Sequence, residues 1–120
     1  MHELSVAMAL HRACLQECPQ GGLELVQVRV GELSGVEPDL LEFAWSACIA
    51  ETRDAGAILE IEFCQASQVC DRCGPVNEKQ PGSWLRLCPY CESPLRVQGG
   101  DELEITAITT KVAPRMEQEA

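Results

Sequence analysis

Four cysteines in two close pairs are the residues of this chain best suited to bind a metal. Cys70 and Cys73 form one Cys-x-x-Cys pair, Cys88 and Cys91 form a second, and 14 residues separate the two pairs. A Cys-x-x-Cys turn can direct two thiolates at one point, and two facing turns complete the tetrahedral sulfur site that Zn²⁺ accepts. The spacing therefore predicts a structural zinc site. Four thiolates leave the ion no open coordination position, so we expect no catalysis there.

Two other readings of the same cysteines stay open. An iron site of the rubredoxin type would use the same four ligands, and residue types alone do not separate it from zinc. Two redox-active dithiols are a further alternative. Such a dithiol normally lies where a strand opens onto a helix, whereas both pairs here lie in a stretch rich in proline. The setting therefore favours zinc.

A second metal-binding pattern lies at the start of the sequence, which reads Met1-His2-Glu3. The α-amino group of Met1 can bind one ion together with the backbone nitrogen and the imidazole of His2. Glu3 can add a fourth ligand through its carboxylate or its amide. Nitrogen ligands in a plane suit Ni²⁺ or Cu²⁺. Taken alone the pattern is weak, because a histidine at position 2 is commonly a solvated residue on a mobile terminus.

The charge of the chain limits its partners. The sequence carries 19 acidic and 9 basic residues, a formal net charge of −10. Nucleic-acid binding needs cations that displace phosphate counterions, so DNA and RNA are not expected as partners. Solubility alone is an equally simple reason for the acidity. No apolar run is long enough to span a membrane, and no secretory signal precedes the first helical pattern, so we expect a cytoplasmic location.

The remaining metal-binding side chains show no shared spacing. Eight cysteines without a secretory signal favour metal binding in a reducing cytosol over disulfides. The second histidine, His11, lies within a helical pattern and is not assigned to a metal. Four cysteines outside the pairs are predicted to be packing residues: Cys14, Cys18, Cys48 and Cys64.

Apolar periodicity predicts the elements that position these residues. Helices are expected over residues 3–18 and from residue 38 onward, and strands over residues 23–30, 57–63 and 102–110. On the last strand Leu103, Ile105 and Ala107 are expected to share the buried face. Strands with one apolar face and two amphipathic helices predict a two-layer α+β domain, with two helices on a three-stranded sheet.

The cysteine segment interrupts this domain. Residues 67–97 hold few aliphatic side chains and cannot bury enough apolar surface to fold alone, but a metal can supply the missing free energy. We expect them to form a zinc-binding domain, an inserted zinc-ribbon-like lobe with four cysteine ligands. Residues 1–66 and 98–120 would then form one discontinuous α+β domain that carries the nickel-binding pattern.

Taken together, these motifs and their order resemble the HypA/HybF family of hydrogenase maturation factors. The resemblance runs in order through nearly the whole sequence. It combines an N-terminal Met-His-Glu with a four-cysteine insert, which is more specific than either part alone. Its motifs are Met1-His2-Glu3-Leu4-Ser5, Gly31-Glu32-Leu33-Ser34-Gly35-Val36, Phe43-Ala44, Gly56-Ala57, the two Cys-x-x-Cys pairs and Gly100-Asp101-Glu102-Leu103-Glu104-Ile105.

The resemblance implies a nickel metallochaperone and not an enzyme. It implies that Ni²⁺ binds at His2, with Met1 and Glu3 contributing, and that zinc is structural. The implied partners are a HypB-type GTPase and the large subunit of [NiFe]-hydrogenase, and in some organisms also urease. The implied zinc ligands are Cys70, Cys73, Cys88 and Cys91.

This sequence departs from the family pattern in small ways. Pro75 follows the first cysteine pair, and Glu92 follows the last cysteine where glycine is common. Neither position is a ligand. The main alternative function is a zinc-ribbon adaptor that binds other proteins without transferring nickel. A homodimer is kept as an alternative to a monomer.

Overall fold

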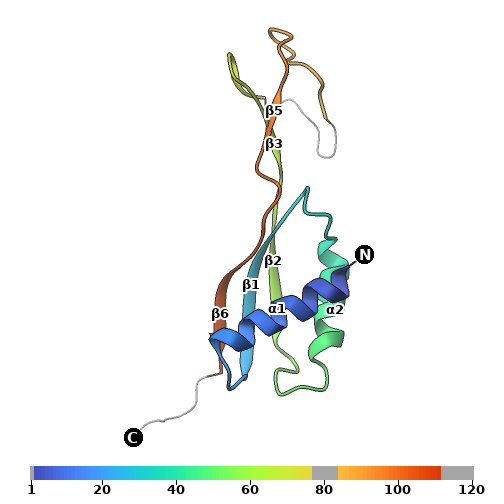
Figure 1. The fold of residues 1–120 in the computed structure, drawn as a ribbon, viewed down its shortest axis with the longest axis vertical. Helices are drawn as coiled ribbons and strands as arrows, with labels where there is room; N and C mark the ends of the chain where they lie inside the picture. The colour runs from blue at the N-terminus through green and yellow to red at the C-terminus, as the bar shows by residue number, and fades with distance from the viewer. Residues whose placement is uncertain (1, 77–83, 112–120) are drawn as a thin grey trace, which may run out of the picture.

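The computed structural model describes residues 2–76 and 84–111. The molecule measures 65 × 32 × 19 Å, with an α+β domain at one end and the cysteine segment at the other (Figure 1). Neither described helix is long and apolar enough to cross a membrane. The elements are α1 (Glu3–Glu17), β1 (Leu23–Gly31), α2 (Pro38–Ile49), β2 (Ile58–Cys64), β3 (Ser67–Cys70), β4 (Gly74–Val76), β5 (Arg96–Gln98) and β6 (Leu103–Thr110).

The α+β domain contains the three-stranded sheet that the sequence predicts. Its strand order is β2-β1-β6, with β2 parallel to β1 and β6 antiparallel to it. Because parallel neighbours need a crossover connection, α2 joins β1 to β2 and packs beside the sheet. Strand β6 returns to the sheet only after the cysteine segment, so the domain is discontinuous in sequence (Figure 1).

The core lies between the two helices and one face of the sheet. Val26, Val28 and Val30 are buried, as their alternation with polar residues predicts. From α2, Trp45 is 1% exposed and its indole N–H donates to the carbonyl oxygen of Ala57 at 3.0 Å. This bond satisfies the one polar group of the largest buried side chain. It also fixes α2 to the start of β2.

The predicted buried face of β6 is partly wrong, because the pairing of β6 with β1 contains a bulge. Gln27 pairs with Ala107 and Val28 with Ile105, so one residue of β6 between them has no partner. A bulge reverses the alternation of side chains beyond it. Ile108 therefore packs against the core with Ile105, whereas Ala107 is exposed. Leu103 is also exposed.

The cysteine segment contains more regular structure than its composition predicts. Strands β4, β3 and β5 form a second, antiparallel sheet in that order. Gln68 of β3 is 4% exposed, and its amide both donates to the carbonyl of Leu85 at 2.8 Å and accepts from its N–H at 3.0 Å. Backbone pairing and the buried amide of Gln68 thus help to stabilise this segment, where other domains rely on an apolar core. These are local hydrogen bonds that apolar periodicity does not reveal.

Three segments cross where the two parts of the molecule meet. The N–H of Gly31 donates to the carbonyl of Glu102 at 2.7 Å, and the N–H of Ala66 donates to the carboxylate of Glu32 at 2.9 Å. A Cβ at Gly31 would lie 2.2 Å from the carbonyl oxygen of Gly100, so only glycine allows this approach. The loop after β1 is therefore hydrogen-bonded to both chain segments that lead into the lobe.

Candidate metal centres

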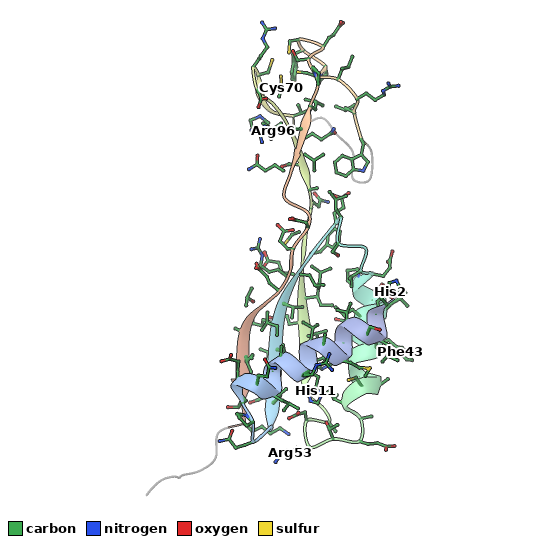
Figure 2. All side chains as sticks on the ribbon, in the orientation of Figure 1. His2, His11, Phe43, Arg53, Cys70 and Arg96 are labelled. Atoms are coloured by element: carbon green, nitrogen blue, oxygen red, sulfur yellow. The ribbon has the colours of Figure 1, made fainter. Side chains whose placement is uncertain are left out.

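The four paired cysteines converge at the far end of the molecule, where Figure 2 labels Cys70. Their sulfur atoms all lie within 4.8 Å of one another, and the Sγ atoms of Cys70 and Cys91 are 3.5 Å apart. In a tetrahedral site with zinc–sulfur bonds of about 2.3 Å, the sulfurs lie about 3.8 Å apart. The cluster therefore fits a zinc ion of this size with small adjustments. Cys70 and Cys88 are buried, Cys91 is partly buried and Cys73 is exposed.

Two similar turns present these cysteines. Cys70 ends β3, and Cys73 precedes Gly74, which has a φ of +90°. In the second turn the N–H of Tyr90 donates to the sulfur of Cys88 at 3.4 Å, and Glu92 has a φ of +64°. The residue after each pair thus takes a left-handed conformation, which glycine adopts without steric cost. Glycine at position 92 would therefore meet the same backbone requirement without the steric cost that Glu92 carries.

Two thiols of the cluster have pKa values that are shifted in opposite directions. The pKa of Cys73 is raised to about 12. The main cause is its hydrogen bond with Cys91, and burial and the other two sulfurs add to the shift. Hydrogen bonds from Ser93, whose Oγ lies 3.3 Å from the Cys91 sulfur, lower the pKa of Cys91 to about 6. The Cys91 thiolate is thus stabilised by hydrogen bonds, whereas the thiol of Cys73 is held in its neutral form, chiefly by its hydrogen bond with Cys91. A bound divalent cation would favour the thiolate form of all four side chains, which is the form that binds a metal.

The N-terminal pattern lies in the α+β domain, well separated from Cys70 (Figure 2). His2 is exposed and is the N-cap residue of α1, and its carbonyl oxygen accepts the N–H of Val6 at 2.8 Å. The first N–H groups of a helix have no acceptor within the helix. Loss of a proton from the amide of His2 or Glu3 therefore breaks no helical hydrogen bond. Met1 lies outside the described residues.

Glu3 has a structural contact that the sequence does not reveal. Its carboxylate accepts the N–H of Glu37, the N-cap residue of α2, at 3.0 Å. This hydrogen bond lowers the pKa of Glu3, so the side chain is held as a carboxylate. The contact joins the start of α1, beside His2, to the start of α2. If the Glu3 carboxylate bound a metal, as one form of the prediction has it, it would have to give up this hydrogen bond to Glu37.

His11 lies away from His2 (Figure 2), and its imidazole pairs with the carboxylate of Asp54. Its Nε2 atom is 2.6 Å from Oδ2 of Asp54, and its ring packs edge-on against Trp45 at 5.8 Å between centroids. Oδ1 of Asp54, a residue only 1% exposed, accepts the N–H of Leu23 at 2.9 Å. No sequence pattern identifies Asp54 as the partner of His11, because Asp54 lies in an irregular loop 43 positions away and follows no periodicity.

The cysteines outside the cluster mostly match the packing prediction. Cys14 is buried in the core, and burial raises its pKa to about 11, so it stays a neutral thiol. Cys18 and Cys48 are partly buried against the same core. Cys64 differs, because it ends β2 beside the guanidinium of Arg29, with which it interacts.

A discontinuous α+β domain that carries a four-thiolate lobe defines a two-part metal-binding protein. A family model described as "Hydrogenase/urease nickel incorporation, metallochaperone, hypA" matches residues 1–110. The chain belongs to this HypA family of nickel-incorporation metallochaperones. Proteins of the family bind nickel and hold a structural zinc on a cysteine cluster, and the cluster described above fits that role.

Individual relatives agree with this assignment. The chain is 36% identical over 116 residues to a hydrogenase maturation factor HypA of Chlorobaculum parvum, covering 91% of this chain and 98% of that one. It is 40% identical over 109 residues to the HypA of Deinococcus radiodurans, covering 88% and 89%. The solution structure of a nickel metallochaperone HypA from Helicobacter pylori superimposes with a TM-score of 0.59 at 23% identity, covering 92% and 97%. At that identity the structural match supports the fold.

Proposed function

We propose that this protein binds Ni²⁺ at its N-terminus and delivers it to the large subunit of [NiFe]-hydrogenase during maturation. The nickel ligands would come from His2, with Met1 and Glu3 contributing. Zinc on Cys70, Cys73, Cys88 and Cys91 would be structural, within a separate zinc-binding domain of residues 67–97. Nickel is cargo in this proposal, and no catalytic step is assigned to the chain.

The observation that carries the proposal is the exposure of His2 at the open end of α1. An imidazole and the neighbouring amide nitrogens there, which take no part in the helical hydrogen bonds, can form a planar nitrogen site, which suits Ni²⁺. Because the Glu3 carboxylate already accepts the N–H of Glu37, we propose that Glu3 contributes through its backbone amide. The bond between α1 and α2 then survives nickel binding.

Delivery requires a site that a partner can dismantle. An exposed terminal site with few protein ligands can exchange them one at a time with an acceptor, whereas the cysteine cluster is closed and partly buried. The net charge of −10 would raise the local concentration of cations and favour basic surfaces on partners. We propose a HypB-type GTPase as one such partner, in the reducing cytoplasm that free thiolates need.

Nickel binding by single variants tests the proposal. His2→Ala should lose stoichiometric Ni²⁺ binding in calorimetry while metal analysis still finds one zinc per chain. His11→Gln is the matched control, because it removes the other histidine but keeps a side chain that can donate to Asp54. Intact mass spectrometry checks that Met1 is present with a free amine, and a Gly-Ser extension before Met1 should also abolish binding.

The outcomes separate two functions. Unchanged nickel stoichiometry in His2→Ala would refute the proposed site. Zinc binding with no His2-dependent nickel binding in the unaltered protein would favour the alternative of a zinc-ribbon adaptor that binds proteins and transfers no nickel.

A further inference from the structure

The outer edge of β2 presents backbone groups that no described strand covers. The carbonyl of Cys64 accepts the N–H of Glu32, so the backbone of Cys64 faces β1. Because successive residues of a strand face opposite edges, Leu59, Ile61 and Phe63 must present their N–H and C=O groups away from β1. The bond from Trp45 to the carbonyl of Ala57 lies on the same outer side and agrees with this alternation.

This edge is regular where the opposite edge is not. Strands β1 and β2 pair without interruption from Leu25 with Ile58 to Gly31 with Cys64. At the other edge of the sheet, β6 carries two register shifts. Proteins commonly protect edge strands with bulges, prolines or lysines. Strand β2 contains none of these and exposes Ile58 by 63% and Phe63 by 48%.

A groove beside β2 has room for the side chains of an added strand. It lies between α2 and the start of β2, with a volume of about 460 Å³ and walls formed by residues that include Trp45, Ile49 and Leu59. Figure 1 shows α2 on the side of β2 away from β1. A strand paired with β2 would thus have one face covered by α2, with apolar side chains in the groove.

The other face of such a strand would meet carboxylates. Glu60 and Glu62 of β2 point to the sheet face away from the helices, and Glu62 is 71% exposed. Arg29 lies among them, but it is shared between Glu62 at 3.8 Å, Glu102 at 3.9 Å and Glu104 at 3.0 Å. The surface stays acidic, so a second copy of β2 would set glutamates against glutamates. A strand with basic side chains would be attracted.

From this edge, groove and charge we propose that β2 is a docking site for an extended segment of a partner protein that alternates apolar and basic residues. The segment adds to the sheet as a fourth strand, its backbone bonded to Leu59, Ile61 and Phe63. Its apolar side chains enter the groove under α2 and its basic side chains reach Glu60 and Glu62. The inference is independent of the nickel proposal, because no residue of the N-terminal pattern takes part.

Proline at position 61 tests the backbone contact. Ile61→Pro removes an N–H that faces outward, so it leaves the bonds to β1 intact, and edge strands tolerate such a proline. Ile61→Ala controls for the lost side chain. The probe is a fluorescein-labelled twelve-residue peptide of alternating valine and lysine, with fluorescence anisotropy as the readout. Ile61→Pro should weaken binding about tenfold or more, and Ile61→Ala far less.

Four further measurements make the outcome decisive. A peptide of alternating proline and lysine has the same charge but cannot form a strand, so it should not bind. The double variant Glu60→Lys, Glu62→Lys should weaken binding more than Glu24→Lys, which alters an exposed acid at the start of β1. Amide NMR shifts on binding should centre on β2. Equal binding of both peptides would overturn the proposal. Unchanged binding by Ile61→Pro would also overturn it, provided that the NMR shifts of the β1 amides show that the sheet is still folded. A dimer of the protein alone that Ile61→Pro dissociates in sedimentation would also overturn it.

Discussion

Replacing Asp54 should destabilise the α+β domain more than any other single polar change in the described core. The side chain is 1% exposed and binds both the N–H of Leu23 and the imidazole of His11. Removal of its carboxylate leaves a buried N–H without an acceptor, a loss of about 1–3 kcal/mol, and deletes a hydrogen bond to a charged group worth about 1.5–3 kcal/mol. For Asp54→Ala we therefore expect a loss of about 3–5 kcal/mol, a large part of the stability of a small domain.

A graded series makes this expectation specific. Asp54→Asn keeps an oxygen for the Leu23 N–H and loses only the charge, so it should lose about 1–2 kcal/mol. Urea unfolding of the zinc-loaded protein measures both, with Trp45 fluorescence in a Trp84→Phe background so that the signal reports on the α+β domain. Combining Asp54→Ala with His11→Ala gives the coupling between the two side chains. Losses within about 0.5 kcal/mol of zero for both Asp54 variants, the size of an ordinary surface change, would refute the reasoning.

The same carboxylate gives the stability a pH dependence of known sign. Burial acts to raise the pKa of Asp54, but hydrogen bonds from Leu23, His11 and Gly22 outweigh it and lower the pKa below its ordinary value of 3.8. A group with a lowered folded pKa stabilises the fold above its unfolded pKa and loses that effect as pH falls through the folded value. The difference between the unaltered protein and Asp54→Asn should therefore be constant near neutral pH and shrink below about pH 4.

Two further variants test the junction and the lobe. Gly100→Ala should cost about 2 kcal/mol or more, because Gly100 has a φ of +86° and its new Cβ would lie 2.4 Å from the Cβ of Ala66. The matched control Gly35→Ala, with a φ of +81° and no atom within 4 Å, should cost only about 1 kcal/mol in thermal unfolding, and equal losses would contradict the steric argument. Cys70→Ser should abolish zinc binding and collapse the NMR dispersion of the lobe, while amides of the α+β domain keep their shifts. Loss of dispersion in both parts would show that they do not fold separately.

Much of the α+β domain was predictable because it depends on local periodicity. The alternation of Val26, Val28 and Val30 with polar residues identified β1 and its buried face, and Pro38 marked the start of α2. The strands of the lobe were not predictable in this way. They are held by backbone pairing and by Gln68, and neither leaves a pattern of apolar residues. The bulge in β6 also escaped, because its position depends on how two strands 79 residues apart come into register.

The sequence by itself determined which four cysteines converge and which residues are candidate nickel ligands. Two Cys-x-x-Cys pairs specify a four-thiolate site because the spacing of each pair suffices to orient two sulfurs, and Met1-His2-Glu3 carries its candidate nickel ligands on consecutive residues. Only the tertiary structure decided what surrounds these groups. It placed Asp54 against His11, bonded the Glu3 carboxylate to the N–H of Glu37, and left the outer edge of β2 without a partner among the described strands. The two hydrogen-bonded contacts join residues 34 or more positions apart, and such pairs are set by the packing of whole elements, which no short stretch of sequence encodes.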